Sequence, residues 1–127
     1  IKTDGSGNLS FATAGATLNN SDLADATTTV ASSATSTLNQ FDKTVYRSVK
    51  LFISITDATN SRFEVVEANV THDGTNAFMS TFGSTTNYTG GLCVFSADID
   101  GDLVRIRVTN ISDASTVFKL QRIAIDI

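Results

Sequence analysis

Residues 46–83 constrain the fold of this chain more than any other part of the sequence. Near the start of this stretch, aliphatic side chains occupy every second position: Val49, Leu51, Ile53 and Ile55. Successive side chains of a β-strand point to opposite faces, so these four should share one buried face. The alternation therefore predicts a half-buried strand.

Two further runs follow, at residues 63–71 and 77–82, and Asp73-Gly74 lies between them. Asp-Gly between two apolar runs is typical of a tight hairpin turn, because both positions tolerate a positive φ. Short polar residues at 57–61 supply an earlier turn. Together these patterns predict an antiparallel meander of three strands.

Strands are also predicted at residues 27–38, 92–99, 103–109 and 116–127. The first of these has Val30, Ala34 and Leu38 four apart, which also allows a helix, but its threonine content favours a strand. About seven strands, with turn signals roughly every 8–12 residues, indicate an all-β antiparallel sandwich of jelly-roll-like type. Its expected core is listed here: Val49, Leu51, Ile53, Ile55, Phe95, Ala97, Val104, Ile106 and Val108.

Charged residues make up only 17% of the chain, and the formal net charge is −4. Nucleic-acid binding needs clustered lysine and arginine, so a nucleic-acid partner is not expected. No apolar run approaches the roughly 20 residues of a membrane span, so no membrane partner is expected either.

The sequence carries no catalytic signature, and we predict no cofactor and no metal site. Asp98, Asp100 and Asp102 surround a glycine turn as in a calcium loop, but a strand follows where an EF-hand would have its helix. We interpret them as turn residues, with a weak calcium site as the alternative. His72, beside Asp73, is likewise interpreted as a turn residue rather than a general acid or base. The lone Cys93 is expected to be a buried small apolar residue.

Residues 1–26 differ from residues 27–127, which we expect to form the sandwich. Their few large apolar side chains bury too little surface to fold alone, so we expect an extended segment that docks on another chain. The assembly contacts predicted there are Leu9, Phe11, Leu18 and Leu23.

A loop rich in glycine, serine, threonine and asparagine is expected at residues 83–91. Surface loops often carry recognition, so Thr85, Asn87 and Tyr88 are candidates for contact with a host glycan. The chain has no tryptophan and two tyrosines, which leaves few aromatic rings for a sugar platform.

Several short motifs, in their order and spacing, resemble a domain of virion structural proteins in T4-like tailed phages, cyanophages especially. They lie at residues 44–50, 63–70, 72–75, 95–99 and 104–106, and residues 3–11 are similar to a short linker of phage fibre proteins. The resemblance implies a non-enzymatic capsid, neck or tail-fibre component of an extracellular virion, often one module of a longer protein. Its partners would be copies of itself and other virion proteins. Two alternatives stay open: a receptor- or glycan-binding tip, and a subunit of another extracellular filament that exchanges its N-terminal strand.

Overall fold

The computed structural model describes residues 2–3, 5, 9–10 and 18–127, and its regular elements are all β-strands. The strands in chain order are β1 (Lys2–Thr3), β2 (Leu9–Ser10), β3 (Ser21–Val30), β4 (Thr35–Asp42), β5 (Tyr46–Asp57), β6 (Arg62–His72), β7 (Ala77–Thr86), β8 (Cys93–Asp100), β9 (Leu103–Asn110) and β10 (Thr116–Asp126). Among the described residues there is no helix that could span a bilayer. The prediction of an all-β fold is confirmed.

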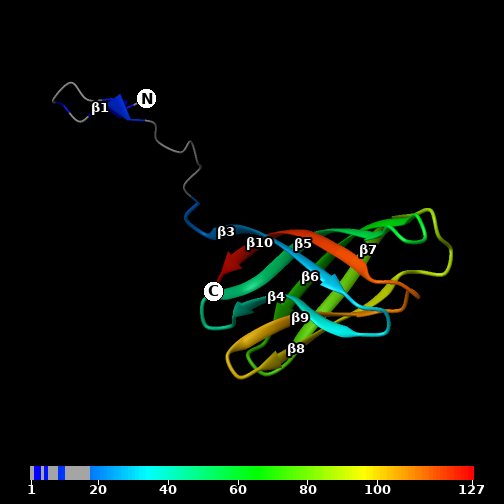
Figure 1. Ribbon diagram of the computed structural model, residues 1–127. Coiled ribbons are helices and arrows are strands. Elements are labelled where there is room, and N and C mark those ends of the chain that lie inside the picture. The colour runs from blue at the N-terminus through cyan, green and yellow to red at the C-terminus, as the bar shows by residue number, and fades with distance from the viewer. Residues whose placement is uncertain (1, 4, 6–8, 11–17) are drawn as a thin grey trace.

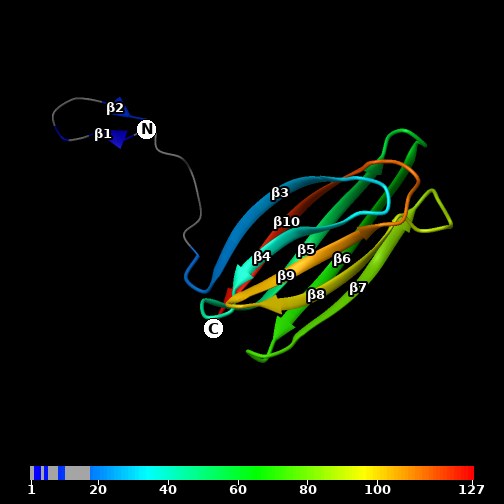
Figure 2. The ribbon, with the colours of Figure 1, turned by 60° about the horizontal axis from the view of Figure 1, so that its bottom comes forward.

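Two antiparallel sheets form the sandwich (Figures 1 and 2). The larger sheet has the strand order β3-β10-β5-β6-β7, and the smaller one has the order β4-β9-β8. The predicted meander is present as β5, β6 and β7, and it stays within the larger sheet. Strands β1 and β2 pair with each other in a separate two-stranded ladder. The predicted antiparallel sandwich is therefore confirmed.

The two sheets contain eight strands rather than about seven, because residues 27–38 belong to two strands and not one. Strand β3 ends at Val30 and β4 begins at Thr35. Ser33 lies between them with a φ of 63°, and the Ala34 amide donates to the Ala31 carbonyl at 3.1 Å. Residues other than glycine seldom adopt a positive φ, and no glycine lies between Val30 and Thr35. The local sequence therefore does not indicate this turn.

The core lies between the facing sides of the two sheets. All seven aliphatic residues predicted for β5 and β9 are buried, and they meet Phe118 and Leu120 of β10. Phe95 and Ala97, also predicted, are only partly buried because β8 is an edge strand. Two strands with a strict alternation of side chains thus supply the centre of the core.

Buried polar groups join the loops at one end of the sandwich. The Asn110 amide nitrogen donates to the carbonyls of Val30 and Ala114 at 3.0 and 2.9 Å, and its oxygen accepts from the Ser112 amide at 2.8 Å. Asn110 is fully buried. Buried polar groups need such partners, so this side chain fixes the β3–β4 and β9–β10 connections together.

A second polar group at the same end is Asp57, whose carboxylate accepts hydrogen bonds from Ser112 and Asn60. The hydrogen bond from Ser112, followed by that from Asn60, lowers the pKa of this carboxyl below its ordinary value. Asp57 therefore links the β5–β6 turn to the β9–β10 turn while it stays ionised.

The opposite end holds both the start of β3 and the end of β10. Ser21 pairs with Ile125, and the Asp126 amide donates to the Asn20 carbonyl at 3.0 Å. Buried Arg122 of β10 donates to Asp22 at 3.0 Å and to Asn39 at 3.1 Å, which joins β3 and β10 to β4. Residues 21–26 are thus part of the larger sheet, which begins before the boundary at residue 26 drawn from the sequence.

Candidate interaction surface

The outward side of the larger sheet carries the largest group of exposed apolar side chains in the described chain. We call it the outer face. Three neighbouring rows of in-register residues cross the sheet from β3 to β7. The first row is Ser21, Ile125, Ser48, Thr71 and Phe78; the second is Leu23, Ile123, Lys50, Asn69 and Ser80; the third is Asp25, Gln121, Phe52, Glu67 and Phe82.

The phase of each strand decides which side chains lie on this face. In β5, Leu51 and Ile53 point into the core, so Phe52 between them must point out, and it is 53% exposed. In β10, Phe118 and Leu120 point in, while Ile123 and Ile125 point out and are exposed. Ile127, just beyond the end of β10, is exposed as well.

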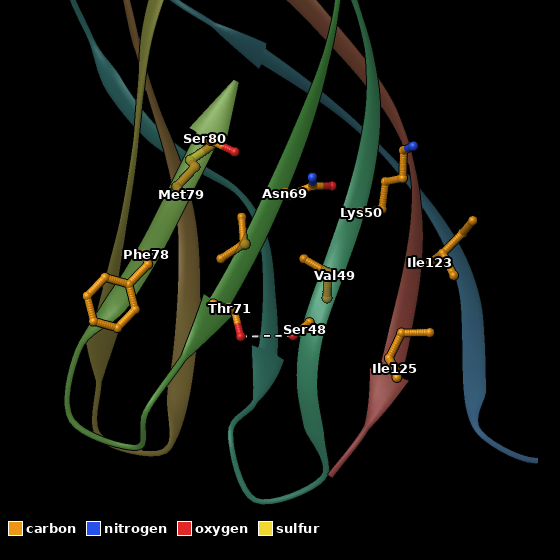
Figure 3. Close-up of a pocket in the computed structure, with 11 residues that line it drawn as sticks. Ser48, Val49, Lys50, Asn69, Thr71, Phe78, Met79, Ser80, Ile123 and Ile125 are labelled. Carbon is orange, nitrogen blue, oxygen red and sulfur yellow. Dashed lines mark hydrogen bonds between the residues drawn. The ribbon is translucent and has the colours of Figure 1, made fainter. Parts of the chain in front are cut away.

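A shallow groove of about 580 Å³ crosses the first two rows between β10 and β7 (Figure 3). Ile123 and Ile125 lie on one side of it and Phe78 on the other. The hydroxyls of Ser48 and Thr71 hydrogen-bond to each other at 2.8 Å across its floor. These two hydroxyls are paired with each other, and Lys50, Asn69 and Ser80 line the groove beside its apolar side chains.

The charges of the outer face balance. It carries two carboxylates, Asp25 and Glu67, and two ammonium groups, Lys50 and Lys119. Lys50 lies 3.5 Å from Glu67 and 5.7 Å from the centre of the Phe82 ring. The chain's net charge of −4 therefore arises outside this face, and like charges do not oppose the approach of a partner here.

The structure describes the side chains of two of the four predicted assembly contacts, Leu18 and Leu23. Leu23 projects from β3 onto the outer face and is 63% exposed, and Leu18 is also exposed. Leu9 belongs to β2, but its side chain lies outside the described part of the chain, as does all of Phe11. Docking of residues 1–26 on another chain stays a prediction.

The predicted recognition loop is shorter than expected, because β7 continues to Thr86 and includes Thr85. Asn87 donates to the Ser61 carbonyl at 3.0 Å and accepts from the Phe63 amide at 2.8 Å. Both ends of its amide thus hold the loop against β6. A glycan contact at these residues stays a prediction.

Tyr88 is half-buried and has little free ring surface. The guanidinium carbon of Arg62 lies 4.0 Å from the centre of its ring, and Gly90 packs so closely that a Cβ there would meet the ring at 2.7 Å. A sugar stacks on an open aromatic face. Arg62 already covers part of the surface that such stacking would use.

The other candidate residues have structural roles in the described chain. Both oxygens of Asp98 accept from Arg105 at 2.7 Å, and Asp100 accepts from the same guanidinium at 3.3 Å. The bond from Arg105 lowers the pKa of the Asp98 carboxyl. No group of three potential metal ligands occurs among the described residues.

His72 and Cys93 lie against the core. The Gly74 amide donates to His72 Nδ1 at 3.1 Å, and Nε2 lies 2.8 Å from the Tyr46 carbonyl, as expected of a residue that supports the turn. Cys93 is partly buried, and burial together with the nearby Glu64 raises the pKa of its thiol to about 12. A thiol with so high a pKa is unreactive at neutral pH.

Sequence reasoning missed most of the outer face. Phe52 could have been found, because it is out of phase with the four aliphatic residues of its own strand. Phe78 and Phe82 were placed within a strand but not assigned a side. Ile123 and Ile125 join them only because β10 lies between β3 and β5.

No protein-family model matches the chain, and no curated protein sequence matches it. Among the solved structures that are similar to the chain are three that are each described as a phage tailspike protein. That of Acinetobacter baumannii phage AM24 is 10% identical, with a TM-score of 0.44 over 83% of this chain and 26% of its own. That of Acinetobacter phage vB_ApiP_P1 is 16% identical, with a TM-score of 0.44 over 98% and 25% of the two chains.

The third, gp49 of Acinetobacter baumannii bacteriophage Fri1, is described as a capsular polysaccharide depolymerase. It is 14% identical, with a TM-score of 0.41 over 84% of this chain and 18% of its own. The chain thus spans between 18% and 26% of the length of the three solved chains.

Proposed function

We propose that the chain is a non-enzymatic structural module of a tailed-phage virion that acts by protein–protein assembly. The phage setting is supported by the resemblance of its motifs to virion structural proteins. The observation that carries the assembly role is the outer face, on which seven large apolar side chains are exposed. They are Leu23, Phe52, Phe63, Phe78, Phe82, Ile123 and Ile125.

The size of the outer face suits a stable interface. Strands in a sheet lie about 4.8 Å apart and rise about 3.4 Å per residue, so five strands paired over about ten residues cover roughly 800 Å². A standard protein–protein interface buries about 800 Å² per partner. This area includes the polar positions of the face, and exposed apolar side chains gathered on one such surface are a mark of interaction sites.

The chemistry of the outer face suits a protein more than a sugar. Four of its polar groups pair with one another, Ser48 with Thr71 and Lys50 with Glu67. A glycan site needs polar groups that are free to bind the ligand's hydroxyls, whereas a protein partner gains most from covering apolar side chains.

Purified particles of the phage that encodes the chain provide the test. Mass spectrometry should detect the chain in them, and the double variant Phe52→Ser/Ile123→Ser should enter particles at least tenfold less than the wild type. Val94→Ser is the matched control, because Val94 is 58% exposed but lies on β8 of the other sheet. Absence of the wild-type chain from particles, or equal entry of all three proteins, would contradict the proposal.

A further inference from the structure

The sandwich has one edge that lacks the usual protection against strand pairing. Strand β7 ends the larger sheet and, among the strands that the structure describes, pairs only with β6. Its ten residues include no charged residue and no proline, and only Ala77 and Met79 are partly buried. The two-sheet sandwich has three other edges, and all contain carboxylates: β3, β4 and β8.

Unpaired backbone groups on an edge strand are a template for another strand, and proteins normally block them with charges, proline or a bulge. The ladder between β6 and β7 does shift, between Val65 and Glu67, next to Gly83 with its φ of 68°. The shift lies beyond Phe82, so residues 77–82 remain a regular stretch with an open edge. This register shift therefore does not protect residues 77–82 from pairing with another strand.

The outward side chains of this stretch have the same order, Phe-Ser-Phe, in either chain direction. Phe78, Ser80 and Phe82 project from alternate positions onto the outer face. If a second copy lies antiparallel with Ser80 opposite Ser80, each Phe78 lies opposite a Phe82. Aromatic pairs directly across two strands stabilise a sheet, and this register forms two of them related by a twofold axis.

We propose that β7 pairs antiparallel with β7 of a second copy, centred on Ser80, so that the larger sheets of the two copies become one continuous ten-stranded sheet. The absence of charge on β7 removes like-charge repulsion between the two edges. The inference rests on the proposed function and deepens it, because it names a second copy as an assembly partner. The pairing also sets the two outer faces side by side as one larger surface.

Cysteine cross-linking of the full chain tests the register. Ser80→Cys should form a disulfide-linked dimer on mild oxidation, because directly opposite residues have Cβ atoms about 4.5–5.5 Å apart. Ser54→Cys is the matched control: Ser54 is also exposed on the outer face but lies on the central strand β5. The native Cys93 should form few disulfide-linked dimers of its own, because it is partly buried. A Ser54→Cys dimer without a Ser80→Cys dimer, or none from either variant, would overturn the proposal.

Sedimentation equilibrium of the full chain gives a second, independent measurement. The wild type should dimerise, and Phe78→Lys/Phe82→Lys should weaken the dimer at least tenfold while circular dichroism shows an unchanged fold. Phe52→Lys, with 53% exposure against 52% for Phe78, should leave dimerisation unchanged. Loss of the dimer in Phe52→Lys alone would overturn the edge pairing in favour of stacked outer faces.

The two proposals fail in different ways. A wild-type chain that is monomeric at every concentration overturns the edge pairing, yet its entry into particles would still support the virion role. A Ser80-linked dimer of a chain that is absent from particles supports the edge pairing and contradicts the virion role.

Discussion

Ile53→Ala should destabilise the protein more than most single changes, because Ile53 lies fully buried at the centre of the larger sheet. It pairs with Leu120 of β10 and Val66 of β6, both buried. The change removes three carbon atoms, which at about 0.8 kcal/mol each amounts to about 2.4 kcal/mol of lost burial. The cavity left behind adds to this cost, and measured values for such truncations are about 2–5 kcal/mol.

Urea unfolding followed by circular dichroism measures this cost, since the chain has no tryptophan to report by fluorescence. We expect a loss of about 3 kcal/mol in the free energy of unfolding, equivalent to about 10–15 °C in Tm for a domain of this size. Phe52→Ala is the control on the same strand and should cost less than about 1 kcal/mol. A cost below about 1 kcal/mol for Ile53→Ala would refute the burial argument, as would a larger loss for Phe52→Ala.

Three further predictions concern polar groups. Asn110→Ala removes the hydrogen bonds of this buried side chain to the Val30 and Ala114 carbonyls and to the Ser112 amide, and should cost about 1–3 kcal/mol by urea unfolding, whereas exposed Ser115→Ala should cost almost nothing. The lowered pKa of Asp57 gives stability that is present above the unfolded-state pKa of about 3.9 and is lost as pH falls through the folded-state value. Tm should therefore drop steeply below about pH 4 in the wild type and less steeply in Asp57→Asn; equal slopes would contradict this role for Asp57. Millimolar calcium should leave Tm unchanged because Arg105 occupies the Asp98 carboxylate, and a rise that chelator reverses would restore the calcium interpretation.

The core of this fold could be predicted because it follows from local alternation. In β5 and β9 every second residue is aliphatic, and this period alone identified which side faces inward. The Asp73-Gly74 turn was equally visible, and Gly74 does adopt a φ of 95°. These features depend only on residues close together in the chain.

The eighth strand of the sandwich and the candidate surface were harder to predict, for two different reasons. The β3–β4 turn uses Ser33 in a left-handed conformation, and no glycine, asparagine or proline marks it. The outer face depends on strand order: Leu23, Ile123 and Lys50 are neighbours only because β10 returns to lie between β3 and β5. Such non-local pairing has no signature in a single sequence.

The central claim is that the outer face and the β7 edge are assembly surfaces, and a cryo-EM reconstruction of the native particle tests it most directly. The account predicts that the domain is present, that β7 pairs with β7 of a second copy, and that Phe52 and Ile123 are covered by a neighbouring subunit. A reconstruction in which the domain projects into solvent, with both β7 and the outer face uncovered, would contradict it.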